Sequence, residues 1–216
     1  MKQFALIQVL VLTTLITFGQ NKPVDFKRVK KMANSESYEK LFDRFVANDT
    51  TLTADDYVLI YYGQAYRKDY KPNARHDSVR ALNMCLNKPV DSIDFRRVLW
   101  YTDLILKDFP FNIEQIFIKG IAYDKLGVKD SSNSWLFKYD KLIRTIISSG
   151  DGKTPGTAFV VVKITDEYAV LNALELNFTG QALVTEKKKM YDLMNVAKNE
   201  YGIDQLYFDI NLFFGK

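Results

Sequence analysis

The sequence predicts an α+β protein in which a repeat-like helical bundle, similar to tetratricopeptide repeats, precedes a small antiparallel β-sheet with one short helix. Apolar residues recur at spacings of three and four from Pro23 to about Ser149, which is typical of helices. A glycine-rich turn over 150–156 interrupts this pattern. β-branched runs and alternating apolar residues follow it. We therefore expect a helical region over 20–149 and a sheet region over 150–216 that pack together as one unit.

The chain begins with the pattern of an export signal over residues 1–19. Lys2 supplies a short positive start, and Phe4 to Phe18 run almost without a polar residue. Small Gly19 follows where a signal peptidase needs a small side chain, and the apolar run is too short to span a bilayer. We expect this segment to be removed, leaving no transmembrane span. The mature protein would then lie in the periplasm or on the extracellular surface.

Composition narrows the class of protein further. A hydrophobic content of 47% suits an ordinary globular core. The single cysteine, Cys85, excludes an internal disulfide, and its apolar neighbours favour a small buried hydrophobic side chain. The net charge of only +4, together with export, gives no reason to expect a nucleic-acid partner.

Two helices are expected before residue 71. The first carries an apolar stripe over 38–46, with aromatic and aliphatic residues at helical spacing. The second begins at a capping box, in which the Thr53 hydroxyl accepts a backbone N–H and the Asp56 carboxylate reaches back. Its helical pattern continues to about Tyr70, before the sequence Lys-Pro-Asn.

Three more helices complete the helical region. Ser92 is the expected N-cap of a long helix that ends at Pro110. Another helix follows at once and ends near Gly127, a plausible C-terminal glycine. Apolar residues over 135–146 mark the last helix of the region.

Two segments, 63–66 and 120–123, share the pattern Gly-x-Ala-Tyr, which resembles the first helix of a tetratricopeptide repeat. Glycine and alanine let a neighbouring helix approach closely, and tyrosine fills the space beside them. The offset of 57 residues excludes a regular tandem array. The pattern favours paired antiparallel helices packed in a repeat-like manner.

The sheet region contains segments with the two-residue period of strands and segments with the helical period of about 3.6 residues. Residues 158–164 predict a buried strand, 165–174 a short helix and 181–185 a second strand. Residues 190–197 fit either a helix or a strand, and we choose a strand because its neighbours are strands. Apolar residues alternate over 206–214, which predicts a final strand with one face in the core.

Several short, aromatic-rich stretches carry a resemblance to a known family. They are Leu52 with Tyr57, the run Ile60-Tyr61-Tyr62-Gly63, Gly150-Asp151-Gly152 leading into Ala158-Phe159-Val160, Glu167-Tyr168, and Leu206-Tyr207-Phe208-Asp209. On these stretches the chain resembles an exported Bacteroidetes family classified as a domain of unknown function, DUF4919, over nearly its whole mature length. The resemblance implies a Gram-negative periplasm or outer surface and brings no known activity with it.

Sites that need a metal or a cofactor are not expected. Gly152-Lys153-Thr154 ends like a phosphate-binding loop, but Ile147 stands where that motif needs glycine, and the loop follows a helix instead of a strand. His76 is the only histidine, so no histidine-based metal cluster is possible. Its polar neighbours suggest an exposed turn. The sequence therefore predicts no cofactor and no metal.

Carboxylates are the remaining catalytic class, and Asp192 and Asp209 are its candidates. Both stand in apolar or aromatic strands, where burial would perturb their pKa values, and adjacent strands could bring them together as in a glycan hydrolase. The favoured alternative places each on the solvent face or in a hydrogen bond to Tyr191 or Tyr207.

The expected function is noncatalytic binding or scaffolding of an envelope peptide, protein or glycan, with a carboxylate-dependent envelope hydrolase as the alternative. The binding residues would lie on a concave helical face and at the junction of the two regions: Tyr61, Tyr62, Tyr66, Asp151, Lys153 and Glu167. Core packing is a simpler explanation for the tyrosines. A third possibility is an assembly subunit, which would need a broad apolar patch or an uncovered strand edge over 205–214.

Overall fold

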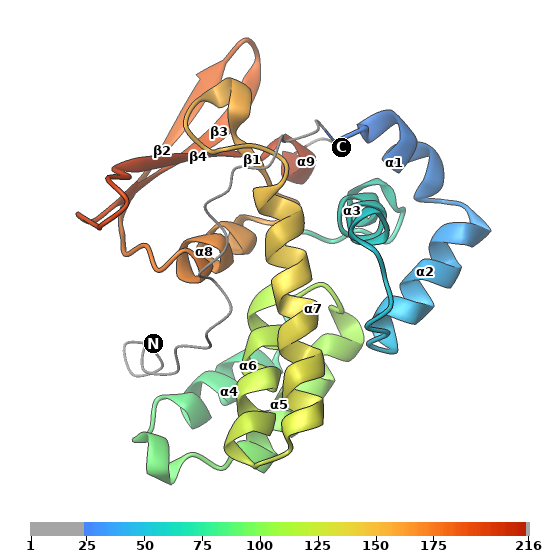
Figure 1. The fold of residues 1–216 in the computed structure, drawn as a ribbon, viewed down its shortest axis with the longest axis vertical. Coiled ribbons are helices and arrows are strands. Elements are labelled where there is room, and N and C mark those ends of the chain that lie inside the picture. Colours follow the sequence, from blue (N-terminus) through green and yellow to red (C-terminus); the bar gives the residue numbers. More distant parts are fainter. Residues whose placement is uncertain (1–23, 215–216) are drawn as a thin grey trace. The chain divides into compact units, whose positions relative to one another are not determined.

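A computed structural model describes residues 24–214 of the protein, so the predicted export signal lies outside the described residues. The described chain contains nine α-helices and a four-stranded sheet, which confirms the α+β class (Figure 1). None of its helices combines the length and the apolar character needed to cross a membrane. The helices are α1 (Phe26–Met32), α2 (Glu36–Val46), α3 (Ala54–Gly63), α4 (Ser78–Leu86), α5 (Phe95–Asp108), α6 (Ile113–Lys125), α7 (Lys129–Ile147), α8 (Ile164–Ala173) and α9 (Asn211–Phe214); the strands are β1 (Phe159–Val160), β2 (Phe178–Glu186), β3 (Lys189–Val196) and β4 (Gln205–Asp209).

The described chain divides into two compact units. Residues 75–136 form the first unit, and residues 24–74 together with 137–214 form the second. The division falls within α7. Helices α1 to α3 therefore belong to the same unit as the sheet, although the helices of 75–136 separate them in sequence.

The sheet has the strand order β1-β4-β3-β2. The β2–β3 and β3–β4 pairs are antiparallel, whereas β1 runs parallel to β4. The predicted antiparallel sheet is therefore wrong at β1, and the sheet is mixed. The reason is connectivity: α8 and the β2–β3 hairpin stand between β1 and β4, so a crossover and not a tight turn joins them.

The β2–β3 hairpin confirms the strand predictions over 181–185 and 190–197. Its turn consists of Lys187 and Lys188, with φ angles of 48° and 66°. Two consecutive left-handed residues match the twist of a two-residue hairpin. Lysine lacks the freedom of glycine at such positions, which is why the sequence carries no obvious turn signal here.

Two predicted strands are shorter than expected. The strand over 158–164 is confirmed only as β1, because the chain turns at 161–163 into α8, and α8 confirms the predicted short helix. The last strand ends at Asp209. The Asp209 carboxylate accepts the Asn211 N–H at 3.0 Å, and α9 begins there. The alternation over 210–214 was therefore a misleading signal for a strand.

The predicted helix starts are confirmed at one position and wrong at another. At α3, Thr53 Oγ1 accepts the Asp56 N–H and Asp56 Oδ2 accepts the Thr53 N–H, which completes the capping box. This helix ends at Gly63 and a 3₁₀ turn extends it only to Tyr66, short of the predicted end. At α5 the N-cap is Asp94, whose carboxylate accepts two backbone N–H groups. Ser92 instead ends a separate 3₁₀ turn.

Close contacts at two glycines confirm the packing reason for the Gly-x-Ala-Tyr pattern. A Cβ at Gly120 would lie 2.8 Å from the Leu136 side chain of α7. A Cβ at Gly63 would clash with the Tyr38 ring of α2. Gly127 ends α6 as predicted, with a φ of 75° and its N–H bonded to the Asp124 carbonyl.

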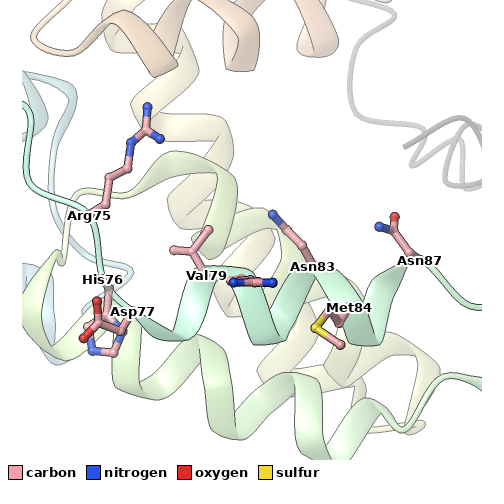
Figure 2. A pocket seen from close by; sticks show the side chains of 8 residues that line it. Arg75, His76, Asp77, Val79, Asn83, Met84 and Asn87 are labelled. Atoms are coloured by element: carbon pink, nitrogen blue, oxygen red, sulfur yellow. The ribbon is translucent and has the colours of Figure 1, made fainter.

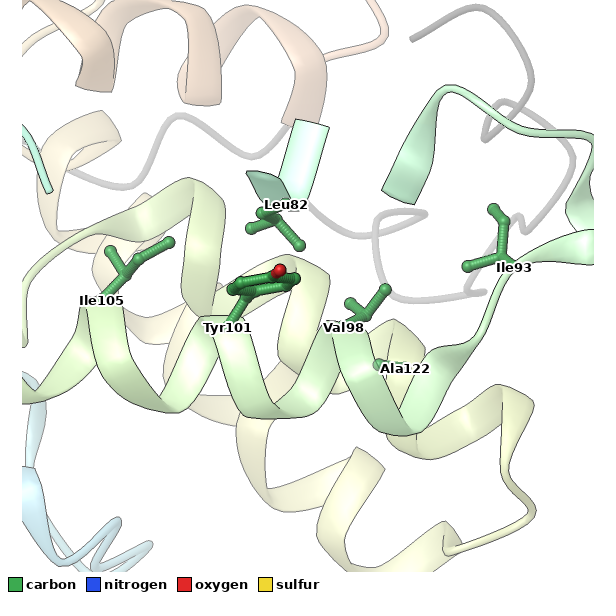
Figure 3. Packing of buried hydrophobic residues seen from close by; sticks show 6 residues of the cluster. All are labelled: Leu82, Ile93, Val98, Tyr101, Ile105 and Ala122. Atoms are coloured by element: carbon green, nitrogen blue, oxygen red, sulfur yellow. The ribbon is translucent and has the colours of Figure 1, made fainter. Parts of the chain in front are cut away.

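The unit of residues 75–136 has its own apolar core. Figure 2 shows Val79, Asn83 and Met84 along α4, and Figure 3 shows the side chains that form the core. Cys85 is only partly buried and packs against this core. The core residues come from α4, α5, α6 and the chain before α5: Leu82, Ile93, Val98, Tyr101, Ile105 and Ala122.

His76 is more constrained than an exposed turn residue would be. Its Nδ1 accepts the Ser78 N–H at 3.0 Å, at the start of α4. Its Nε2 lies 3.5 Å from Asp108 Oδ2, and its ring meets Phe109 edge-on. The histidine therefore links the start of α4 to the end of α5 within this unit.

Candidate functional site

The predicted anchors Tyr61 and Tyr62 lie in the core, and both side chains are 0% exposed. The Tyr61 hydroxyl donates to Asp166 Oδ2 at 2.7 Å and accepts the Val162 N–H at 3.1 Å. The Tyr62 hydroxyl donates to the Val160 carbonyl at 3.2 Å. As placed, neither ring is accessible to a ligand at the surface. The packing explanation holds for both, because they join α3 to the chain around β1.

The remaining predicted binding residues do not converge. Tyr66 is half-buried, and Lys30 Nζ lies 6.0 Å from its ring centroid. Asp151 and Lys153 form a local turn, in which the Lys153 N–H donates to Asp151 Oδ1 at 3.0 Å. Glu167 is 0% exposed. The predicted set is therefore divided between the core and a turn, and it does not line one surface.

The predicted pair Asp192 and Asp209 is separated by the sheet itself. On the paired strands Asp192 stands opposite Phe208, and Asp209 stands opposite Tyr191. Because successive strand residues point to opposite faces, the two carboxylates lie on different faces. Asn211 donates to Asp209 Oδ1 through its side chain at 2.6 Å. The two aspartates do not share a cleft, so this acid pair is not formed.

Asp192 has a different carboxyl neighbour, Glu167 of α8. Glu167 is fully enclosed, and the Asp192 carboxylate lies beside its carboxyl group. Burial, followed by the nearby Asp192 carboxylate, raises the pKa of Glu167 to about 9. A carboxyl group of this kind is protonated at neutral pH. It can therefore lie next to the buried Asp192 without adding a second negative charge.

Asp166 completes what we name the acidic junction, which consists of Asp166, Glu167 and Asp192. Asp166 Oδ2 accepts the Tyr61 hydroxyl at 2.7 Å and the Lys163 N–H at 3.3 Å, so this residue caps α8. Burial raises the pKa of Asp166 to about 6, and the Tyr61 hydrogen bond opposes that rise. The carboxylate that caps the start of α8 is therefore that of Asp166.

The acidic junction connects to the surface through Gln181 of β2. Gln181 Nε2 donates to Asp192 Oδ2 at 2.6 Å, and Gln181 Oε1 accepts the Tyr168 hydroxyl at 3.3 Å. Sequence reasoning singled out Asp192 by its apolar surroundings. It missed Gln181, because an exposed glutamine in a strand carries no signal of a buried partner.

The surface above the junction is the outer edge of β2. This strand has nine residues and pairs only with β3 among the described strands. Its side chains are exposed along most of its length, and Leu183 is 62% exposed. At its start Phe178, 42% exposed, meets the ring of Tyr168 at 5.4 Å. We name Tyr168, Phe178, Ala182 and Leu183 the β2 edge.

Two surface pockets are lined by residues that do not belong to the β2 edge. One, of about 540 Å³, is lined entirely by residues 75–87, including Arg75 and Arg80 (Figure 2). The other, of about 370 Å³, surrounds Arg67, whose guanidinium already contacts Glu39 at 2.5 Å and Asp69 at 3.1 Å. None of the predicted site residues lines either pocket.

Histidine, cysteine and carboxylate side chains do not gather into metal-binding groups of three within residues 24–214. The β2 edge and the acidic junction adjoin one another on β2, β3 and α8. One is an open strand with exposed apolar side chains, and the other is a buried group of three carboxyl residues that Gln181 joins to the strand through Asp192.

Comparison with known proteins assigns the chain to a family. The description of the matching family is "Domain of unknown function (DUF4919)", and its match covers residues 26–214. No curated protein and no solved structure matches the chain. The match includes α1 to α9 and all four strands. The chain therefore belongs to the DUF4919 family.

Proposed function

We propose that this protein is a noncatalytic binding module that holds an extended segment of a protein partner against β2 as an additional strand. The observation that carries the proposal is the exposed outer edge of β2, which is the longest strand of the sheet and, within residues 24–214, pairs with a strand on one side only. Such an edge offers a row of backbone N–H and C=O groups to another chain. The exposed Leu183 and Phe178 side chains would add apolar contacts.

A binding role agrees better with the acidic junction than catalysis does. Glu167 is fully enclosed, and Asp192 is 5% exposed. A substrate would have to displace Gln181 before it could reach either carboxyl group. The acidic junction is better suited to a structural role, because it holds β2 and α8 in place beneath the surface that the partner would contact.

A protein segment is a better candidate than a glycan. Carbohydrate sites commonly present flat aromatic rings to the sugar. Tyr61 and Tyr62, which were predicted to serve as anchors, are buried. The β2 edge presents a strand with the aliphatic side chains of Ala182 and Leu183, and its two rings, Tyr168 and Phe178, meet edge to face instead of forming a flat platform. These are features that an extended polypeptide matches through main-chain hydrogen bonds and alternate side-chain contacts.

We place this function outside the cytoplasm, in a Gram-negative periplasm or on the outer surface of a member of the Bacteroidetes. The support is the apolar segment over 4–18 with Gly19 after it. We also propose that the helices of residues 75–136 act as a tetratricopeptide-like scaffold. The close contact of Gly120 with Leu136 supports repeat-like packing of α6 on α7.

The proposal is tested with peptides selected from a random displayed library on the mature protein, residues 20–216. Affinities of the selected peptides are then measured by fluorescence anisotropy for the parent protein, Leu183→Lys and Met84→Lys. Met84 is a matched control, because it is 66% exposed on α4 and also loses an apolar side chain to a charge. We expect Leu183→Lys to weaken binding at least about tenfold, with Met84→Lys unchanged. Equal affinities for all three proteins would refute the role of β2.

A further inference from the structure

We infer that the partner of the β2 edge is a second copy of this chain, which pairs antiparallel with β2 and joins two four-stranded sheets into one. This inference rests on the proposed binding role of β2 and names the partner. The first reason is that the regular part of β2, from Gly180 to Glu186, lacks the usual protection. Natural edge strands carry inward charges, lysines or prolines that prevent pairing. Within β2, the sequence FTGQALVTE has one charged residue, Glu186 at its last position, and no proline.

The distribution of charge favours an antiparallel arrangement of two copies. Glu175 lies exposed just before β2, and Lys187 and Lys188 follow its last residue. Lys187 also contacts Glu186 at 3.5 Å within the chain. Antiparallel pairing would bring the basic end of each strand toward the acidic start of the other. Parallel pairing would place lysines beside lysines, which is unfavourable.

The side chains favour one register, with Leu183 directly opposite Leu183 of the second copy. The regular part of β2 begins after the irregularity between Phe178 and Gly180 and ends at Glu186, so Leu183 is its midpoint. In this register Ala182 would stand opposite Val184, and Gln181 opposite Thr185. Apolar side chains would thus meet apolar side chains, and the most exposed of them would be covered by its own copy.

Shifting the register by one residue on each strand would place Ala182 at the centre and Gln181 opposite Leu183. That arrangement leaves the exposed leucine facing an amide that already donates to Asp192 at 2.6 Å. It covers less apolar surface.

A charge-swap experiment tests this inference on the mature protein by sedimentation velocity over a range of concentrations. We expect the parent protein to form dimers. Leu183→Lys and Leu183→Glu should each raise the dimer dissociation constant at least about tenfold, because like charges would stand directly opposite one another. An equimolar mixture of the two variants should restore dimers, because lysine would then face glutamate. Met84→Lys serves as the control and should dimerise as the parent does.

A cross-linking experiment tests the register. In a Cys85→Ala background, Leu183→Cys should form an intermolecular disulfide on mild oxidation, and Met84→Cys should not. Two results would overturn the inference: a parent protein that stays monomeric at every concentration, or variants that do not recover dimers on mixing. If the protein is monomeric but selected peptides still bind in a Leu183-dependent manner, the second-copy inference fails while the proposed function stands. If neither dimer nor peptide binding is seen, both fail.

Discussion

The side chain of Gln181 donates a 2.6 Å hydrogen bond to the carboxylate of Asp192, which joins an exposed residue of β2 to a buried acid of β3. Asp192 stands opposite Leu183 in the β2–β3 ladder. The donor therefore belongs to the same stretch of strand that we propose as the binding edge. The stability of that edge should depend on this one contact.

Replacement of Gln181 by methionine should lower the free energy of unfolding by about 1–3 kcal/mol, because a buried acceptor loses its donor. Chemical denaturation measures the difference. Gln205→Met is the matched control, since Gln205 donates to Asn195 Oδ1 at 2.8 Å on an exposed part of the sheet. Its cost should be under about 0.5 kcal/mol. A similar loss of unfolding free energy in both variants would show that the hydrogen bond to Asp192 stabilises the protein no more than the exposed one does.

Glu167 should make the protein less stable as the pH rises. Its pKa is raised from 4.5 to about 9 in the folded protein, so between these values the folded chain holds a proton that the unfolded chain has released. Its stabilising contribution is complete below the lower value and is lost as the pH rises through the higher one. The free energy of unfolding should therefore fall with pH, by at most about 1.4 kcal/mol per pH unit.

The test is chemical denaturation between about pH 7.5 and 8.5, above the range in which Asp166, with a pKa of about 6, titrates, for the parent protein and Glu167→Gln. Glutamine keeps the shape of the protonated acid and does not titrate, so this variant should lose the pH slope. Glu175→Gln, at an exposed position, should keep it. A slope that persists in Glu167→Gln would mean that another group causes it.

Tyr61→Phe should cost about 2–4 kcal/mol, because it removes the donor to the buried Asp166 and the acceptor of the Val162 N–H together. Tyr168→Phe removes a hydroxyl from a 38% exposed ring and should cost under about 0.5 kcal/mol. Thermal unfolding of both variants gives the comparison. Equal melting temperatures would contradict a structural role for the Tyr61 hydroxyl.

Gly120→Ala should destabilise the protein although alanine is the better helix former. The added Cβ would lie 2.8 Å from two carbons of the Leu136 side chain, and overpacking of this kind costs about 1–3 kcal/mol.

At Gly127 the space around the residue is open, but its φ is 75°. Gly127→Asn should therefore be milder than Gly127→Ala, since asparagine tolerates this conformation better. Denaturation curves of the three variants test both expectations.

The sequence alone predicts the structure correctly where the signal lies within a few neighbouring residues. The capping box of Thr53 and Asp56, the glycine at the end of α6 and the periodicity of α2, α7 and α8 all act within a few residues, and each is confirmed. The sequence does not predict an element that forms only through contacts with residues far away in the sequence. A two-residue β1 exists only because Phe159 and Val160 pair with Phe208 and Asp209 of β4.

The candidate site illustrates the same limit. Asp192 was a candidate because a carboxylate within an apolar strand can be buried, and it is buried. The favoured alternative, a position on the solvent face or a hydrogen bond to a neighbouring tyrosine, is wrong for Asp192, because its donor is Gln181. Its partners Glu167 and Gln181 come from α8 and β2, and no spacing rule joins them to β3. The tyrosines of α3 were predicted to bind a ligand. Tyrosines whose hydroxyls form hydrogen bonds with residues far away in the sequence have the same sequence pattern as exposed tyrosines.

Hydrogen exchange followed by mass spectrometry, on the mature protein at low and at high concentration, tests the β2 edge most directly. Edge amides that pair with a second copy exchange more slowly as the concentration rises, whereas amides in a monomer do not respond. We predict concentration-dependent protection confined to residues 178–186, absent in Leu183→Lys and present in Met84→Lys. Exchange of these residues that does not change with concentration, or protection that appears within residues 75–136 instead, would contradict the account.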